Sequence, residues 1–566
     1  MPKLKRFAPL FSAGFAFLLL QFSLQSGVYG ATGKNAMVAT AHSLATDAAL
    51  EVLRQGGNAV DAAVAAQWVL NAAEPFSSGI GGGGFFLYYE AASKRIYAFD
   101  GRERAPEATV PTLYLDEKGE VLPYIPDRVT GGHSVGVPGT LKLLKTVHER
   151  FGSELFFFAS LFEPAIAVAE NGFSVSARFS KYLGEQQERL GLFEASRKIF
   201  FKENGQILQT GDLLIQPDLA QTFRLIQREG IRVFYEGEIA EDIMNCVRNA
   251  PYRPGRMALS DLLYYEVIGR EAIHGNYRGY DIFSMGPPSS GGTTLVETLQ
   301  ILEQFDLQSL GRGRDFAHVF SESQKLAFQD RNTYLGDPDF SEIPLFKILS
   351  KDFAKKRFRQ IKIDQVLPPT GTGPNLSGAH TSHISIVDLA GNMVAYTTTI
   401  EHVFGSAMVV PGRGFLLNNE LSDFDAMPWR EEKQMRPNAP ESEKRPLSSM
   451  TPTFVFHEGK PLLIVGSPGG STIIGTVLNI LVNVVDFKMG LAEALGAPRI
   501  INRDGAVELE EELFNRPNLR EFLEKKGHVV ESNSFFGNAQ AIYFDPQSDV
   551  IIGESDPRGE GQSAGF

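Results

Sequence analysis

The chain has 566 residues with 54 basic and 67 acidic side chains, which gives a formal net charge of −13. Apolar residues make up 43 % and charged residues 21 %, a globular composition that excludes a disordered tail protein, a coiled coil and a polytopic membrane protein. No basic run is present, so a nucleic-acid partner is not expected. At ~150 residues per domain, the length alone suggests three or four domains.

The N-terminus predicts a signal peptide, residues 1–30. Basic side chains at 3–6 precede a mostly apolar run at 7–24, and Val28 and Gly30 occupy positions −3 and −1 of a cleavage site before Ala31. The alternative is a membrane anchor, but a proline, a glycine and a glutamine interrupt the apolar run. We therefore expect export to the periplasm or the extracellular space, without a stable membrane anchor.

Helices dominate the next part of the chain. The pattern predicts helices over 43–73, 140–200, 217–250, 294–305 and 315–331, and a strand at 85–89 after the glycine run 79–84. A Pro/Gly-rich loop at 368–374 follows. Beyond residue 381 the chain turns to short β-branched strands, with two helices at 471–485 and 517–526. Strands and helices mixed without strict alternation favour a layered α+β fold.

Two familiar motifs fail because of their surroundings. Gly79, Gly81 and Gly84 match G-x-G-x-x-G, but a dinucleotide site needs a strand before the glycines and a helix after them. Here the predicted order is helix, glycines, strand. Residues 132–136 match the nucleophile elbow G-x-S-x-G around Ser134, yet the preceding segment is polar and contains a proline. Ser134 is therefore a minor alternative, and no cofactor is expected.

Cysteine and histidine usage points away from disulfides and metals. The single cysteine, Cys246, has no partner within the chain and lies in a predicted helix, where a small buried apolar role is favoured over that of a nucleophile. The ten histidines include no helical i, i+4 pair and there is no CxxC. No metal site is predicted.

A β-hairpin is predicted around Ala390, with strands at 383–388 and 393–399. In that register Thr381 faces Thr399, and directly opposed residues have Cβ atoms ~5 Å apart. A bulge would change the register. By itself a threonine pair is ordinary β propensity, so its interpretation depends on the surrounding sequence.

That surrounding sequence resembles the γ-glutamyltranspeptidases (glutathione hydrolases). Residues 380–388, His-Thr-Ser-His-Ile-Ser-Ile-Val-Asp, are similar to the start of the family's small subunit. Five further motifs follow in the family's order: Arg102-Glu103-Arg104-Ala105-Pro106, Pro287-Pro288-Ser289-Ser290-Gly291-Gly292, Leu416-Leu417-Asn418-Asn419-Glu420 with Asp423-Phe424, Arg445-Pro446-Leu447-Ser448-Ser449-Met450, and Gly466-Ser467-Pro468-Gly469-Gly470. The resemblance covers nearly the whole mature chain.

The resemblance implies an N-terminal-nucleophile hydrolase with a four-layer αββα sandwich. Family members are inactive precursors that cleave themselves before a threonine, here at His380–Thr381. The products would be a large subunit, 31–380, and a small catalytic subunit, 381–566, that stay together as a heterodimer with one interleaved core. This replaces the domain count suggested by length.

The resemblance also implies the site and its chemistry. The Thr381 hydroxyl would attack a γ-glutamyl compound such as glutathione, with the freed α-amine, reference pKa ~7.7–8.0, as base. Water or an amino-acid or peptide acceptor would then take the acyl group. Thr399 would support Thr381, and Gly469 and Gly470 would stabilise the oxyanion. The substrate head group would meet Arg102, Ser448 and Ser449 at its α-carboxylate, and Glu420 and Asp423 at its α-ammonium, with these charges at opposite ends of one cleft.

Two departures from the family pattern bear on specificity. Glu401 stands where the family commonly has an asparagine that helps to bind the α-ammonium. It predicts either tighter ammonium recognition or a different substrate. The lid-loop position between Asp423 and Pro446 contains no tyrosine and is polar, which favours hydrolysis over transpeptidation. The alternatives are an acylase for β-lactam side chains or γ-polyglutamate on the same fold, and an inactive binding homologue.

Overall fold

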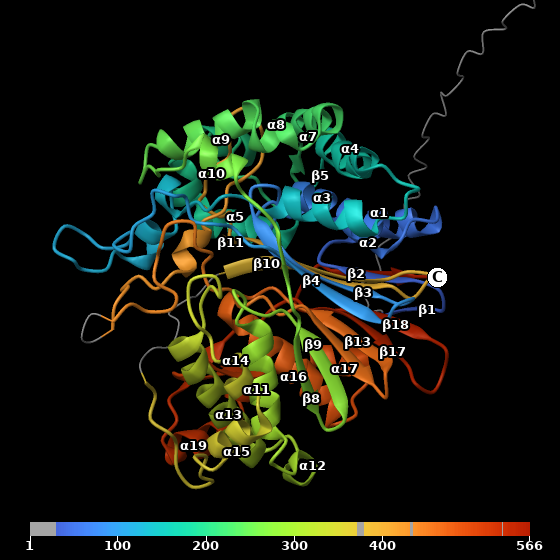
Figure 1. Ribbon diagram of the computed structural model, residues 1–566, viewed down its shortest axis with the longest axis vertical. Helices are drawn as coiled ribbons and strands as arrows, with labels where there is room; N and C mark the ends of the chain where they lie inside the picture. The colour runs from blue at the N-terminus through green and yellow to red at the C-terminus, as the bar shows by residue number, and fades with distance from the viewer. Residues whose placement is uncertain (1–29, 371–378, 431–433, 535) are drawn as a thin grey trace, which may run out of the picture.

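The computed structural model describes residues 30–370, 379–430, 434–534 and 536–566. The predicted signal peptide lies outside them except for Gly30. Within these residues the protein consists of two seven-stranded sheets stacked between two layers of helices (Figure 1). The predicted αββα sandwich is confirmed.

One sheet joins strands from both ends of the chain, all antiparallel to their neighbours. Its order is β19 (Gln562–Gly565), β2 (Met37–Thr40), β10 (Ala379–Val387), β11 (Met393–His402), β3 (Gly83–Glu90), β4 (Arg95–Gly101) and β7 (Ile268–Arg270). The central hairpin β10–β11 comes from the part after residue 378, and its neighbours β2 and β3 come from the first hundred residues. The segments on either side of the predicted cleavage point therefore share one sheet.

The second sheet is interleaved in the same way. Its order is β1 (Ala31–Gly33), β18 (Ile551–Ser555), β17 (Gln540–Phe544), β13 (Lys460–Gly466), β12 (Thr453–His457), β9 (Tyr280–Ser284) and β8 (Ile273–Tyr277). The two faces that meet between the sheets bury small and apolar side chains, such as Ala39, Leu87 and Ala395 from one sheet and Ile464 from the other. Smaller sheets are formed by β14 (Ile500–Asn502), β15 (Val507–Glu510) and β16 (Val530–Asn533), and by β5 (Phe173–Ser174) and β6 (Leu213–Leu214).

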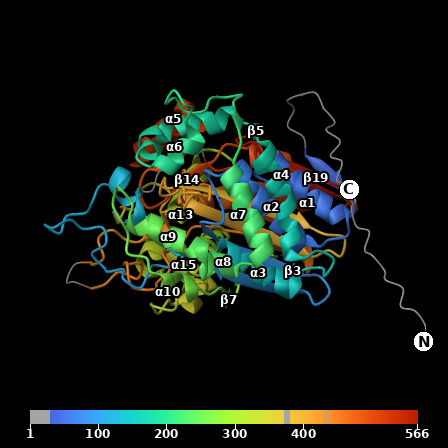
Figure 2. The ribbon, with the colours of Figure 1, turned by 90° about the horizontal axis from the view of Figure 1, so that it is seen from above.

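The helices of the first 270 residues form one outer layer, which Figure 2 shows from above. They are α1 (Ser43–Arg54), α2 (Ala59–Ala73), α3 (Thr140–Phe151), α4 (Glu163–Asn171), α5 (Ala177–Gly191), α6 (Glu194–Phe200), α7 (Pro217–Glu229), α8 (Arg232–Tyr235), α9 (Glu238–Arg248) and α10 (Leu259–Leu263). The predicted helix over 43–73 is two helices, because Gly56 adopts a left-handed φ of 91°.

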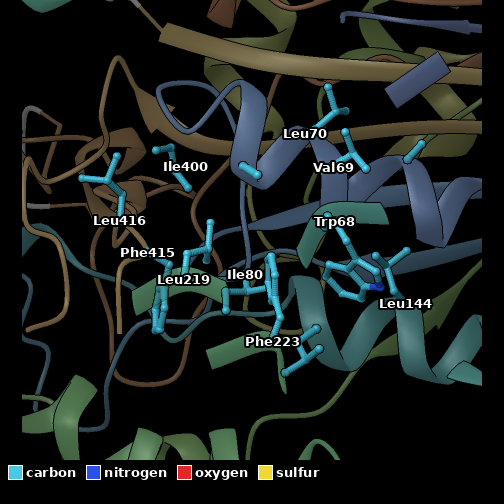
Figure 3. Packing of buried hydrophobic residues seen from close by; sticks show 14 of the residues in the cluster. Trp68, Val69, Leu70, Ile80, Leu144, Leu219, Phe223, Ile400, Phe415 and Leu416 are labelled. Carbon is cyan, nitrogen blue, oxygen red and sulfur yellow. The ribbon is translucent and has the colours of Figure 1, made fainter. Parts of the chain in front are cut away.

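The alanine-rich helix α2 lies at the centre of this layer. All fifteen of its residues are buried, because alanine lets neighbouring elements approach closely. Trp68 fills the remaining space by stacking on Phe162 with 4.5 Å between ring centroids, and Leu144 and Phe223 lie close by (Figure 3). This packing fixes the end of α2, which is adjacent to β10.

The opposite layer covers the second sheet. It contains α11 (Gly291–Leu302), α12 (Leu307–Leu310), α13 (Arg314–Tyr334), α14 (Leu345–Ile348), α15 (Lys351–Phe358), α16 (Ile473–Val485), α17 (Leu491–Gly496), α18 (Glu511–Phe514) and α19 (Pro517–Lys526). The short helices α17 and α18 were not predicted from the sequence. Among the described residues, no helix is both long and apolar enough to span a membrane.

Candidate active site

The hairpin β10–β11 brings the two predicted threonines together. Thr381 pairs with Thr399 in the observed register, with an irregularity only before Thr381. The predicted register is confirmed. The two hydroxyl oxygens are 3.4 Å apart and both side chains are buried. They point to the face between the sheets, whereas Ser382 points to the helical layer.

The Thr399 hydroxyl has three partners. It donates to the carbonyl oxygen of His380 at 2.7 Å, and it accepts from the Thr381 hydroxyl and, at 2.8 Å, from the backbone N–H of Glu401. A hydroxyl has one proton to donate and two lone pairs to accept with, so this arrangement uses all of them. It places a polarising donor on the His380 carbonyl and the Thr381 hydroxyl next to it.

The glycine run presses against this hairpin. A Cβ on Gly82 would lie 2.0 Å from the carbonyl oxygen of Thr399, and one on Gly84 would lie 2.6 Å from that of Thr397. Only glycine permits so close a backbone approach. The predicted order of helix, glycines and strand is confirmed by α2 and β3, so the G-x-G-x-x-G match is not a dinucleotide site.

Arg102 is buried beside two of the predicted ammonium ligands. It forms an ion pair with Glu420 and another, at 2.5 Å, with Asp423, and its Nε donates to the carbonyl oxygen of Pro446 at 3.2 Å. Burial disfavours its charge, but attraction to Glu420 and Asp423 outweighs this and raises the pKa of Arg102. The expectation that these charges stand at opposite ends of the cleft is therefore wrong, because they are in direct contact.

Several buried carboxyl groups surround the single guanidinium of Arg102. Burial, reinforced by repulsion from Asp423, raises the pKa of Glu401 to about 8, although Asn419 donates to its Oε2 at 2.6 Å. Burial also raises the pKa of Glu420 and that of Glu103, the latter to about 7. Such an acid-rich pocket favours a cationic ligand.

A cavity of about 230 Å³ is lined by the two threonines, Arg102 and acidic side chains around it. Its wall includes every predicted catalytic and substrate-binding residue except Gly469: Arg102, Thr381, Thr399, Glu401, Glu420, Asp423, Ser448, Ser449 and Gly470. Gly470 adopts a φ of 55° and begins the short 3-10 helix η6 (Gly470–Thr472) between β13 and α16. Gly469, φ 133°, directly precedes it and is half-buried. The glycine pair thus occupies the predicted strand-to-helix turn.

Sequence reasoning missed several groups on or behind this wall. Arg128 and Arg331 line the cavity, and Tyr124 contacts Glu401 from the same side at 3.4 Å. In the sequence Arg331 is one charged residue of a long helix, with no signal that its side is buried. Glu103 lies within a motif used for the family resemblance but received no role.

The alternative sites do not have the geometry that they need. Ser134 lies in a 3-10 turn, η2 (Gly132–Ser134), and its hydroxyl donates to the Gly131 carbonyl at 2.8 Å. The described segment before it forms a helical turn rather than a strand. Cys246 is on α9, and burial raises the pKa of its thiol to about 12, which keeps it protonated. Within the described residues no cluster of His, Cys, Asp and Glu could hold a metal ion.

The comparison with known proteins identifies the family. The model of the family described as Gamma-glutamyltranspeptidase matches residues 45–566. The chain belongs to the gamma-glutamyltranspeptidase family. It is 39 % identical over 554 residues to the glutathione hydrolase proenzyme of Bacillus subtilis strain 168, covering 94 % of this chain and 92 % of the relative. It is 37 % identical to the Escherichia coli K12 proenzyme, covering 93 % and 90 %.

A solved structure extends the likeness over the whole fold. The cephalosporin acylase from Bacillus halodurans superposes with a TM-score of 0.84 at 28 % identity and covers 97 % of this chain and 99 % of its own. This gamma-glutamyltranspeptidase family member therefore has the N-terminal-nucleophile hydrolase sandwich, and its family activity is that of a hydrolase or acyl transferase.

Proposed function

We propose that this protein cleaves itself between His380 and Thr381 and then acts as a γ-glutamyl hydrolase and transpeptidase on compounds such as glutathione. The observation that carries the proposal is the Thr399 hydroxyl, which contacts both the His380 carbonyl oxygen and the Thr381 hydroxyl. A donor on the carbonyl that is to be attacked and a nucleophile beside it are the two elements that the first step needs.

In self-cleavage, the Thr381 oxygen attacks the carbonyl carbon of His380. The C–N bond breaks as the nitrogen takes up the hydroxyl proton, and an ester links His380 to the Thr381 oxygen. Water then hydrolyses the ester, leaving a His380 carboxylate and a Thr381 with a free hydroxyl and a free amine. The two subunits, 31–380 and 381–566, remain associated because both contribute strands to each sheet.

In the catalytic cycle, the free amine of Thr381 takes the hydroxyl proton as the oxygen attacks the γ-carbonyl of the substrate. The developing oxyanion receives backbone N–H groups at Gly469 and Gly470. The leaving amine departs with a proton and leaves a γ-glutamyl ester on Thr381. Water releases glutamate from this ester, or an amino acid or peptide accepts the acyl group.

The head group is recognised by charge. Glu401, Glu420 and Asp423 supply the negative side of the cavity, where raised pKa values for Glu401 and Glu420 reflect carboxyls crowded together away from water. A substrate ammonium relieves that repulsion. Ser448, Ser449 and Arg102 receive the α-carboxylate. The mixture of cationic, anionic and hydroxyl side chains on this wall favours an amino-acid head group over an apolar acyl chain.

An acylase that removes β-lactam side chains is the second candidate, because the Bacillus halodurans cephalosporin acylase shares the fold at high similarity. A γ-polyglutamate hydrolase and an inactive binding homologue are the others. We further propose that residues 1–30 direct export to the periplasm or the extracellular space, and that the polar lid position favours water over amine acceptors.

A denaturing gel of the purified protein tests self-cleavage. Wild type should give two bands, and Thr381→Ala should remain a single chain. A single band for wild type under all conditions would sink the proposal. Release of glutamate from glutathione, compared with release of the acyl side chain from a cephalosporin, then separates the first candidate from the second, and a dipeptide acceptor measures the transfer reaction.

A further inference from the structure

A second arginine in the cavity wall has no counter-ion among the residues that the structure describes. Arg331 lies on α13, is 7 % exposed and lines the same cavity as Thr381. Its Nε donates to the Ser290 hydroxyl at 2.9 Å, its Nη2 to the Ser449 hydroxyl at 3.1 Å, and its Nη1 to the Asn332 side chain at 2.9 Å. All three partners are neutral.

Among the described residues, no carboxylate lies within 4.0 Å of the Arg331 guanidinium. Burial lowers the pKa of Arg331 to about 10, and Asp423 and Asp425 offset this only in part and from a distance. Arg102 is the opposite case, since two carboxylates contact it. A buried cation without a counter-ion is costly, and that cost is recovered when an anion enters the cavity.

The contact with Ser449 shows which anion. The Ser449 hydroxyl accepts from Arg331, and no described group accepts the proton of that hydroxyl. The Ser448 hydroxyl likewise accepts, from the Met450 N–H at 3.1 Å. Because each oxygen is held by a donor, each O–H remains available to donate into the cavity. Two such donors with a cation behind one of them form a receptor for a carboxylate.

Arg331 also ties the two loops that carry this receptor. Ser290, which accepts from its Nε, donates through its hydroxyl to the carbonyl oxygen of Ser448 at 2.6 Å, and its N–H donates to the same oxygen at 2.7 Å. One guanidinium thus reaches Ser449 directly and the Ser448 backbone through Ser290. A lysine could supply the charge but could not span both serines in this way.

We propose that Arg331 is a positioning residue for recognition of the substrate α-carboxylate: it orients the Ser449 hydroxyl and adds a second positive charge to that of Arg102, which is already paired with Glu420 and Asp423. This inference rests on the proposed function. It deepens that function by adding a second arginine to the carboxylate end of the head-group site.

The test compares two anilide substrates with the processed enzyme. One is γ-glutamyl anilide, and the other is 4-aminobutanoyl anilide, which lacks the α-carboxylate but keeps the amide to be cleaved. For Arg331→Met we expect KM for γ-glutamyl anilide to rise about 10- to 100-fold, the range for hydrogen bonds to charged groups, with a small change in kcat. The kcat/KM for the truncated substrate should change less than about threefold.

Arg436→Met is the matched control. Arg436 lines the same cavity and has no carboxylate within 4.0 Å among the described residues, but it donates to the Trp429 carbonyl at 3.4 Å and not to Ser449. The substitution Arg436→Met removes the same charge as Arg331→Met, and it should leave the KM values for both substrates within about threefold of wild type. An equal rise in KM for Arg331→Met and Arg436→Met would overturn the positioning role in favour of bulk charge.

Further variants guard against misfolding. If Arg331→Met does not process, Arg331→Lys and Ser449→Ala replace it, and each should raise KM for γ-glutamyl anilide only. Equal losses on both substrates would mean a structural role and refute the inference. Unchanged KM values for these variants, with a wild type that is active on γ-glutamyl anilide, would refute the inference as well. A wild type that releases no aniline from γ-glutamyl anilide would instead refute the proposed function, and this inference with it.

Discussion

Glu74 offers a sharp test of how the core beneath the nucleophile is organised. It caps the C-terminus of α2, is 1 % exposed, and accepts from the Ser382 hydroxyl at 3.0 Å. Burial raises its pKa from 4.5 to about 7, against the attraction of Arg178, whose Nη1 is 3.8 Å from the Glu74 Oε1. Glu74→Gln mimics the protonated carboxyl and keeps an acceptor for Ser382.

The sign follows from the raised pKa. Between pH 4.5 and 7 the folded chain holds a proton on Glu74 that the unfolded chain releases, so the free energy of unfolding falls as pH rises through this window. The stability is fully present below pH 4.5 and lost above pH 7. The difference between the two pKa values corresponds to about 3 kcal/mol. Glu74→Gln lacks this term, so its advantage over the parent should grow by about 3 kcal/mol from pH 4.5 to pH 8.

Urea unfolding in a Thr381→Ala background measures this without the complication of two chains. The quantity compared is the difference in unfolding free energy between Thr381→Ala and Thr381→Ala with Glu74→Gln, at several pH values. Glu194→Gln, at a side chain that is 76 % exposed, is the control and should give a difference that does not change with pH. A pH-independent difference for Glu74→Gln would refute the reasoning that a buried, largely protonated carboxyl lies next to Ser382.

Two other substitutions test the site itself. Gly82→Ala should lower the free energy of unfolding by about 3 kcal/mol or more and slow self-cleavage, because its Cβ would lie 2.0 Å from the Thr399 carbonyl oxygen. A thermal melt and a denaturing gel measure the two effects. Gly191→Ala, with no atom within 4 Å of its Cβ, is the control and should be neutral in both. Glu401→Gln should abolish a rise of about tenfold in the affinity for L-glutamate between pH 6 and 8, since burial raises the pKa of Glu401 to about 8 and Glu401 attracts the ammonium only in its ionised form. An unchanged pH dependence of inhibition by glutamate would contradict this assignment.

Local patterns were enough to predict the hairpin. Alternating β-branched residues on both sides of a short turn fix the register, and Thr381 pairs with Thr399 as expected. The helical character of α2 likewise follows from its contiguous alanines, although the break at Gly56 that separates it from α1 was not predicted. Each of these features depends on residues within about twenty positions of one another, where propensity and periodicity act.

The charges around the cavity were beyond such reasoning. Arg331 and Glu74 are on helices from opposite outer layers, and only the sandwich brings them toward the hairpin. A helix shows its apolar stripe in the sequence, but not which of its charged residues is buried by elements hundreds of positions away. The expected separation of Arg102 from Glu420 failed for the same reason: the residue types were right, and their mutual distance depends on the tertiary fold.

Under the proposed function, one hydroxyl serves both maturation and catalysis. Thr399 donates to the His380 carbonyl in the uncleaved chain. Cleavage breaks the bond between this carbonyl group and Thr381. The Thr399 proton is then available to another carbonyl oxygen or to the Thr381 oxygen itself. The N–H of Glu401, which adopts a left-handed φ of 75°, still holds the Thr399 oxygen in place. The strained backbone at Glu401 therefore serves both stages. It presents the N–H that keeps the Thr399 hydroxyl fixed, while the group that this hydroxyl contacts changes from a peptide to a substrate.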